Sequence, residues 1–324
     1  MKETNIYILS CVENGGIYRY SLSDGGALNF VDKVTLDRPM YSIIENNKFY
    51  TILREPFFED KNSGLIVFDL DNGKLKNPTK IISTKGEVAC HLCADNGLIY
   101  VVNYTSGSII RMPDKLVKHI GSSINKNRQA TPHAHYVGLT PDNKYICAVD
   151  LGLDKIILYD KNLNFISNVS VKPGNGARHL IFSDNGKYAY CANELSSTVT
   201  VFSYNSGNLC FENEYTTFPE EFSENNAPAA IRFHKGYIYV SNRGHNSIAC
   251  YKTVENTLEL IDFTNCGGCS PRDFNIYDDF LICTNEESDN VVIFKILNGI
   301  LVKINQISVP KPLCVCYDYN DLRM

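Results

Sequence analysis

The sequence lacks any long hydrophobic run. Its first apolar stretch, Ile6–Leu9, is four residues long before polar residues return. A signal peptide needs an apolar core of about 7–15 residues, and a membrane-spanning helix needs about 20. We therefore do not expect an exported or membrane-spanning protein, and we predict a cytoplasmic protein with no membrane partner.

The sequence also lacks an excess of basic residues. Lysine and arginine total 31 against 36 aspartate and glutamate residues, which gives a net charge of −5 over 324 residues. Nucleic acids and anionic membranes attract basic surfaces, so this balance argues against either as the main partner. An anionic ligand would instead need a local cluster of basic side chains.

Cysteine, by contrast, is plentiful. The 12 cysteines should be reduced thiols in a chain without an export signal. Two Cys-X-X-Cys matches occur, at Cys90–Cys93 and Cys266–Cys269, but they lie far apart and the first falls inside a strand-like run. A zinc or redox role is the less favoured interpretation, so we expect neither a metal site nor a cofactor.

No segment shows convincing helical periodicity, which excludes coiled-coil and α/β readings. One pattern recurs instead: an apolar strand, an Asn or Asp, a short polar turn and a second apolar strand. The opening Asn or Asp returns at intervals of 43 to 49 residues. The clear copies are "YVVNYTSGSIIRM" (100–112), "CAVDLGLDKIILY" (147–159), "YCANELSSTVTVF" (190–202), "YVSNRGHNSIACY" (239–251) and "ICTNEESDNVVIF" (282–294), with looser copies at 6–22 and 49–70.

Repeats of about 40–50 residues made of short strands indicate a β-propeller. A strand precedes each hairpin, as in "RHLIFS" (178–183), and another follows, as in "FISNVSV" (165–171). The chain begins with a hairpin that has no strand before it and ends with "PLCVCYDY" (312–319), a strand with no hairpin after it. We predict an all-β, seven-bladed β-propeller with four antiparallel strands per blade. Residues 1–324 would form one domain, closed by pairing the N-terminal hairpin with the C-terminal strand.

Polar residues of several blades should meet at one mouth of the central channel. In an up-and-down blade, the loop that enters the inner strand and the turn of the following hairpin emerge on the same face. Entry positions carry imidazole, guanidinium and carboxylate groups, and so do several hairpin turns. The residues expected on this rim are His91, His133, His135, Arg178, His179, Arg272, Asp273, Tyr104, Glu194, Arg243, His245 and Glu286.

Each rim residue could also have a purely structural role. The Asn or Asp that opens each turn is expected to bond backbone amides. His91, His133 and His179 could simply pack between blades, and an arginine on a rim is often a solvated charge. Three arginines on one mouth of an acidic protein favour an anion-binding site.

The motifs "PHAHYVGLTPDNKYICAVDLGLDKIILY", "GARHLIFSDNGKYAYCANELSSTVTVF", "YIYVSNRGHNSIACY" and "SPRDFNIY" with "TNEESDNVVIFKI" resemble those of the seven-bladed lactonase propellers. This family includes propeller-type 6-phosphogluconolactonases and carboxy-cis,cis-muconate lactonizing enzymes. The resemblance implies a catalytic set of His135, Arg178, Glu194 and Arg243. Blade 1, "RPMYSIIENNKFYTILREPFFED", departs from the family pattern, as does "FHKGYIY" in blade 5.

The resemblance implies a lactonase for a small anionic lactone, with 6-phosphogluconolactone of the pentose phosphate pathway preferred. Glu194 or His135 would be the base, and Arg178 would stabilise the oxyanion. Arg243, with Arg272 or His245, would hold the substrate's anion, and His133 and His179 are further binding candidates. The alternatives are lactone formation from a carboxy-muconate-like acid and a non-catalytic binding scaffold. The chain has no tryptophan, so it lacks the Trp-Asp signature of common scaffold propellers. We expect a monomer or weak homodimer.

Overall fold

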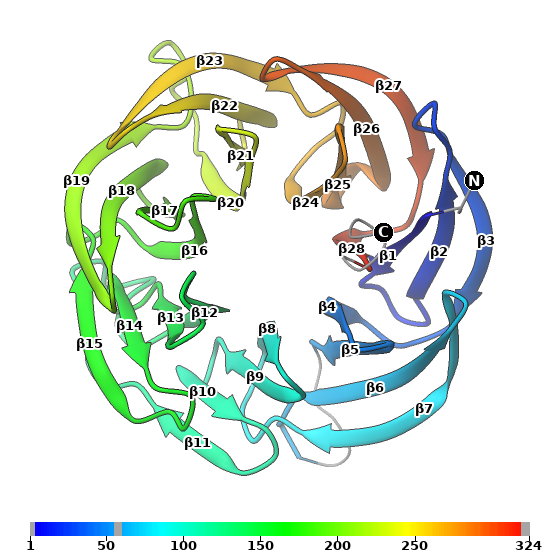
Figure 1. The fold of residues 1–324 in the computed structure, drawn as a ribbon, viewed down its shortest axis with the longest axis horizontal. Helices are drawn as coiled ribbons and strands as arrows, with labels where there is room; N and C mark the ends of the chain where they lie inside the picture. Colours follow the sequence, from blue (N-terminus) through cyan, green and yellow to red (C-terminus); the bar gives the residue numbers. More distant parts are fainter. Residues whose placement is uncertain (1–3, 55–59, 319–324) are drawn as a thin grey trace.

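Seven four-stranded antiparallel sheets form a ring in a computed structural model of the chain, which describes residues 4–54 and 60–318. Figure 1 shows the sheets around a central axis, with one strand of each sheet nearest the axis. The predicted seven-bladed β-propeller is therefore confirmed. The only helical element of the described residues is a single 3-10 turn, η1 (Glu286–Ser288).

We number the blades from the first complete one. From the innermost to the outermost strand, blade 1 is β4 (Pro39–Glu45), β5 (Lys48–Leu53), β6 (Gly64–Asp71) and β7 (Lys74–Ser83). Blade 2 is β8 (Ala89–Asp95), β9 (Leu98–Asn103), β10 (Ser108–Arg111) and β11 (Lys115–Lys118). Blade 3 is β12 (Ala134–Leu139), β13 (Ile146–Asp150), β14 (Lys155–Tyr159) and β15 (Phe165–Ser170).

The remaining blades follow the same order. Blade 4 is β16 (Ala177–Phe182), β17 (Tyr188–Asn193), β18 (Thr198–Asn205) and β19 (Asn208–Thr216). Blade 5 is β20 (Ala227–His234), β21 (Tyr237–Arg243), β22 (Ser247–Val254) and β23 (Thr257–Asn265). Blade 6 is β24 (Pro271–Tyr277), β25 (Phe280–Asn285), β26 (Asn290–Leu297) and β27 (Ile300–Ser308). Blade 7 is β28 (Pro312–Tyr317), β1 (Thr4–Ser10), β2 (Gly16–Leu22) and β3 (Leu28–Val34).

Ring closure occurs in blade 7, as predicted. The C-terminal strand β28 pairs antiparallel with β1, and Ile6 lies opposite Tyr317 in the register. The chain ends therefore contribute to the same sheet (Figure 1). This pairing leaves no blade without its inner strand, so the ring has no gap in its wall.

The core consists of apolar layers between neighbouring blades. The second strand of a blade is covered on both faces, so strands such as β13 and β25 are buried throughout and read as continuous apolar runs. Outer strands face solvent, and β15 has only exposed and half-buried positions. Each buried cluster joins adjacent blades; one, for example, packs Ile6 and Ile8 of blade 7 against Ile282 and Val291 of blade 6.

In blades 2 to 6, the Asn or Asp that opens the hairpin turn is fully buried and structural. Asp150 accepts bonds from the backbone amides of His133 and Leu153, as expected. Asn103 and Asn242 differ: their side chains donate to the carbonyls of Thr84 and Thr217, in the loop that enters the inner strand of the same blade. These residues fasten the entry loop to the hairpin and hold the rim in place.

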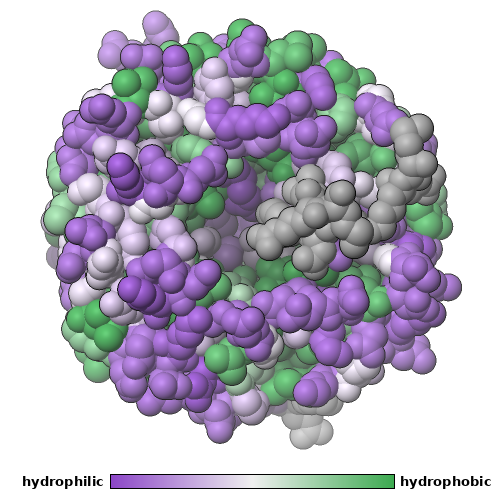
Figure 2. Space-filling view, viewed as in Figure 1, coloured by the Kyte–Doolittle hydropathy of each residue, from purple (hydrophilic) through white to green (hydrophobic). Residues whose placement is uncertain are grey.

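The centre of the ring is hollowed on the face shown in Figure 2, where hydrophilic residues gather around the opening. No helix among the described residues is both long and apolar enough to cross a membrane.

Candidate active site

Every inner strand carries a register shift near its start, which inserts one extra residue against the second strand. A β-bulge of this kind turns a side chain out of the normal alternation. In blades 2, 3, 4 and 6 the extra residues are Cys90, His135, Arg178 and Arg272. We call the seven such positions the bulge ring; its other members are Met40, Ala229 with Ala230, and Leu313.

A second ring lies beside the first. In each blade, one residue of the second strand pairs with the inner-strand residue before the bulge, and the second ring consists of the residue that follows it: Cys11, Arg54, Tyr104, Leu151, Glu194, Arg243 and Glu286. We call it the hairpin ring. Both rings occur at the same end of the channel, because the inner strand begins where the second strand ends. The fold thus gives each blade two positions at this mouth.

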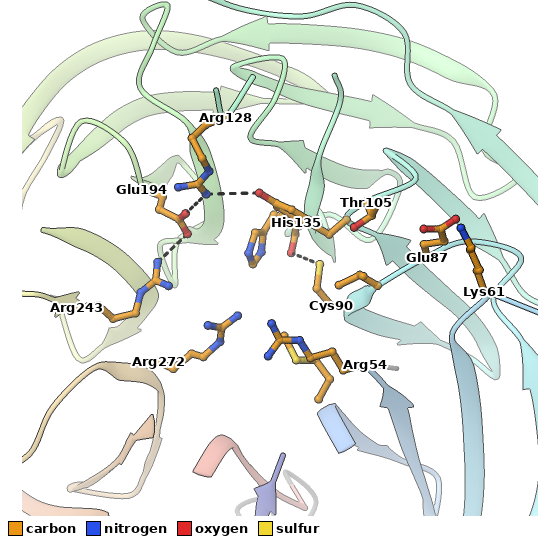
Figure 3. A pocket seen from close by; sticks show the side chains of 13 residues that line it. Arg54, Lys61, Glu87, Cys90, Thr105, Arg128, His135, Glu194, Arg243 and Arg272 are labelled. Atoms are coloured by element: carbon orange, nitrogen blue, oxygen red, sulfur yellow. Dashed lines mark hydrogen bonds and ion pairs between the residues drawn. The ribbon is translucent and has the colours of Figure 1, made fainter. Parts of the chain in front are cut away.

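Members of both rings line a cavity of about 720 Å³ (Figure 3). The chain has a net charge of −5, but this cavity is locally positive. Its acidic lining residues are Glu87 and Glu194. Its basic lining residues are Arg54, Lys61, Arg128, Arg243 and Arg272. The cavity therefore suits an anionic ligand.

Glu194 is the centre of an ion-pair cluster at one side of the cavity. Its Oε1 lies 2.6 Å from Nη2 of Arg128. Its Oε2 lies 2.9 Å from Nε of Arg178 and 2.7 Å from Nη2 of Arg243. Burial by itself would raise the pKa of Glu194, but the guanidiniums of Arg243 and Arg178 outweigh it and hold this pKa well below its usual range. The carboxylate is charged at neutral pH and is a weak base.

Arg178 lies in the wall behind Glu194 and is buried. Besides Glu194, its guanidinium donates to the carbonyl of Ala229 at 2.6 Å and contacts Nε2 of His179 at 3.2 Å. Burial, together with the nearby Arg243, lowers the pKa of Arg178 to about 9, so it stays protonated at pH 7. Arg178 is not among the described residues that line the cavity. This placement favours orienting Glu194 over touching a ligand.

His135 lines the cavity, and its ring is almost fully buried. Burial lowers the pKa of His135 well below its usual range, and the charge of Arg178 lowers it further. The imidazole is therefore neutral at pH 7 and can accept a proton. Its Nδ1 has no hydrogen-bond partner within the described part of the chain. Its ring contacts the rings of Tyr104 and His179, with centroids 5.5 and 5.3 Å apart.

Of the other sequence-predicted residues, Arg272 lines this cavity, whereas His133, His179 and His91 do not. Arg272 lines the cavity and pairs with Glu286 at 3.2 Å. His133 stacks on Tyr104 with the ring planes 14° apart, beside the cavity and not in its lining. His179 lies deeper, where it lines a second cavity of about 360 Å³ in the channel together with His91.

The position of His245 differs from our prediction, because His245 does not line the cavity. We expected Arg243 and His245, two residues apart in one turn, to face the same cavity. Arg243 does, but Nδ1 of His245 lies 2.7 Å from the hydroxyl of Ser247, and its ring packs against Phe222. Residues near Phe222 belong to an irregular segment outside the repeat, so the repeat pattern gave no sign of this aromatic partner.

Sequence reasoning missed Arg128, Arg54 and Lys61. Arg128 belongs to the irregular segment between β11 and β12, and no repeat position marks it. Arg54 could have been found, because it occupies the hairpin-ring position of blade 1 that corresponds to Glu194 in blade 4. The turn after it is longer in the sequence than in the other repeats, which hid that alignment.

The cysteines do not form a metal centre in the described residues, where no group of three His, Cys, Asp or Glu side chains could hold an ion. Cys90 is buried and its thiol lies against the carbonyls of Ala134 and His135. The thiol of Cys266 contacts the carbonyl of Gly268, and that of Cys269 contacts Glu287. All are free thiols.

Comparison with known proteins gives consistent similarities. Residues 5–317 match the family model described as "Lactonase, 7-bladed beta-propeller". An uncharacterized protein of Staphylococcus aureus is 36% identical over 317 residues, covering 89% of this chain and 91% of that protein. A crystal structure of a Lactobacillus plantarum protein is similar with a TM-score of 0.90 and 26% identity, over 98% of this chain and 99% of that one. A Bacteroides fragilis structure provisionally described as a 6-phosphogluconolactonase gives 0.87 and 26%, over 98% of each chain.

Proposed function

The chain belongs to the seven-bladed β-propeller lactonase family, and from this premise we propose that it hydrolyses an anionic sugar lactone, with 6-phosphogluconolactone as the preferred substrate. The observation that carries the proposal is the pairing, in one positive cavity, of a neutral His135 with guanidiniums held by Glu194. The description of the Bacteroides fragilis relative supports the choice of substrate. Such an enzyme would act in the pentose phosphate pathway, in the cytoplasm.

In the proposed reaction, His135 removes a proton from water as the water oxygen attacks the lactone carbonyl. The carbonyl oxygen becomes a tetrahedral oxyanion, which a cavity-facing guanidinium stabilises; Arg243 and Arg128 both line the cavity. The ring carbon–oxygen bond then breaks, and the leaving oxygen takes the proton from His135. The product acid ionises and releases one proton. Oriented charge at a developing oxyanion contributes about 3–4 kcal/mol to such reactions.

The environment of Glu194 argues for His135 as the base. Both carboxylate oxygens are occupied by guanidiniums, whereas the neutral imidazole of His135 lines the cavity and forms no ion pair among the described residues. Glu194 instead fixes Arg128 and Arg243 in the cavity wall. The family resemblance implies that Arg178 stabilises the oxyanion, but Arg178 is not among the described residues that line the cavity. In the proposed reaction it instead holds the Glu194 carboxylate in position.

The test is the ring-opening rate with 6-phosphogluconolactone, unphosphorylated gluconolactone and a carboxy-muconate, each measured against the uncatalysed rate. We expect turnover of the phosphorylated lactone. His135→Ala should lower kcat about 10²–10⁴-fold, and added imidazole should restore part of it. His234→Ala is the matched control, because His234 contacts Asp279 away from the cavity. No turnover of any lactone by the folded protein would refute the proposal, whereas turnover of the muconate alone would favour lactone formation.

A further inference from the structure

Two arginines converge on the side of the cavity opposite Glu194. Arg54 follows β5 in blade 1, and Arg272 is the bulge-ring residue of β24 in blade 6. Figure 3 shows both side chains extending into the cavity with their guanidiniums toward each other, below Glu194 in this view. Blade 7 lies between them in the ring.

Blade 7 has no charged or long polar side chain at its bulge-ring and hairpin-ring positions. These positions hold Cys11 and Leu313, and Leu313 is buried. The space between Arg54 and Arg272 is therefore open to both guanidiniums. Burial raises the pKa of the Cys11 thiol, while Arg54 and Arg272 both act on it in the opposite direction. Both guanidiniums therefore lie near the same small side chain.

The two guanidiniums on this side have between them a single carboxylate partner, Glu286, in the described part of the chain. Arg128 and Arg243 already pair with Glu194. Arg272 forms one ion pair within the described ranges, to Glu286 at 3.2 Å. Among residues 4–54 and 60–318, Arg54 forms no ion pair with a carboxylate. Two like charges facing each other are stabilised when an anion lies between them.

We propose that Arg54 and Arg272 together bind the phosphoryl group of the lactone substrate, an inference that rests on the proposed function. Each guanidinium is a planar fork of N–H donors, so two forks can engage the several oxygens of one phosphoryl group. A single carboxylate has two oxygens and matches only one fork. The lactone carbonyl would then lie toward His135, on the other side of the cavity.

Arg54→Gln tests the phosphoryl site without activity as a readout. Isothermal titration at low ionic strength, with inorganic phosphate as the probe and acetate as the comparison, measures anion binding directly. Losing one charge-assisted fork should weaken phosphate binding about ten- to a hundredfold. Arg54→Lys, which keeps the charge but loses the fork, should fall between. Arg111→Gln is the matched control, because Arg111 contacts Asn162 on the outside of the ring.

Kinetics separates this inference from the proposed function. Arg54→Gln should raise KM for 6-phosphogluconolactone at least about tenfold and leave KM for the unphosphorylated lactone unchanged. Phosphate affinity that is equal in wild type and Arg54→Gln, or undetectable in wild type, overturns the phosphoryl site even if lactones are hydrolysed. Phosphate binding that depends on Arg54 without any lactone turnover supports the anion site and refutes only the proposed reaction.

Discussion

Glu194 pairs with three guanidiniums through one carboxylate, and the three arginines come from different parts of the chain. Arg178 belongs to the inner strand of the same blade, Arg243 to blade 5, and Arg128 to the segment between blades 2 and 3. A buried charge is tolerated only when it is paired and hydrogen-bonded. Removing Glu194 would therefore leave Arg178, which is buried, without its carboxylate.

Glu194→Gln should destabilise the fold at pH 7 by about 3–5 kcal/mol, the usual cost of leaving one partner of a buried pair uncompensated. The folded-state pKa of Glu194 lies well below the unfolded value of about 4.5, so its stabilising contribution is fully present above that value. The contribution is lost as the pH falls through the folded pKa. Urea unfolding of both proteins at pH 7, 5 and 3.5 measures the difference, which should be constant at the first two and smaller at the third.

Asp32→Asn provides the comparison for this prediction. Asp32 also pairs with an arginine, Arg19, at 2.6 Å, but its side chain is 35% exposed. Exposed pairs contribute about 0–1 kcal/mol. A cost for Glu194→Gln no larger than that for Asp32→Asn would show that the cluster does not behave as a buried charge network.

At the scale of strands and turns, the repeat carried most of the predictable information. Buried second strands read as apolar runs, and the buried Asn or Asp before each turn gave the alignment of the blades. That alignment predicts His135, Glu194, Arg243 and Arg272 at one mouth of the channel, and all four line the cavity. The alignment predicts these positions correctly because each bulge and each hairpin turn occurs at the equivalent position of the next blade.

What the repeat could not predict came from segments that do not repeat. Arg128 reaches Glu194 from the irregular stretch before β12, and Phe222, from the stretch before β20, draws His245 away from the cavity. The direction of a side chain in a turn depends on such neighbours, which are far away in the sequence. Arg54 is the intermediate case, because its strand follows the repeat but the turn after it is longer in the sequence than in the other repeats.

Gly86→Ala tests how the entry loop is fastened to the hairpin. A Cβ at Gly86 would lie 2.4 Å from the side-chain nitrogen of Asn103, the atom that donates to the carbonyl of Thr84. Both Asn103 and Thr84 are fully buried, so the amide has little space to move. We expect a loss of about 1–3 kcal/mol, measured by urea unfolding.

Gly25→Ala is the matched control for that substitution. The nearest atom to a Cβ at Gly25 is the hydroxyl of Ser23 at 3.9 Å, and the backbone there does not require glycine. It should change stability by less than about 0.5 kcal/mol. Equal effects of the two substitutions would mean that Asn103 does not hold the entry loop in place.

At the scale of the whole molecule, the ring is what makes one site out of residues from many blades. Each blade alone offers one bulge-ring and one hairpin-ring position. Cyclic arrangement turns these positions toward a common axis, so that blades 1, 2, 3, 4, 5 and 6 all contribute to one cavity. The site therefore depends on closure of the ring, including the pairing of β28 with β1 in blade 7.

Deleting residues 312–324 should abolish cooperative folding. The deletion removes β28, in which every residue from Pro312 to Tyr317 is buried. Its apolar side chains contribute about 1.5–3 kcal/mol each, a total comparable with the net stability of a domain, about 5–15 kcal/mol. It also leaves β1 as an unpaired edge, a surface prone to aggregation. Size-exclusion chromatography and circular dichroism melting should show aggregation and no sharp transition.

A circular permutant tests whether the position of the chain ends matters when β28 is kept. Residue 324 is joined to residue 1 by a short Gly-Ser linker, and the chain is opened in the turn between β22 and β23, beside the exposed Glu255. All 28 strands remain, so the ring can still close, and the linker joins strands that already pair in one sheet. The permutant should melt cooperatively within about 5 °C of wild type and keep its catalytic rate. A truncated chain that melts like wild type would mean that blade 7 does not need its inner strand. A permutant that fails to fold would mean that the native order of blades, and not closure alone, is required.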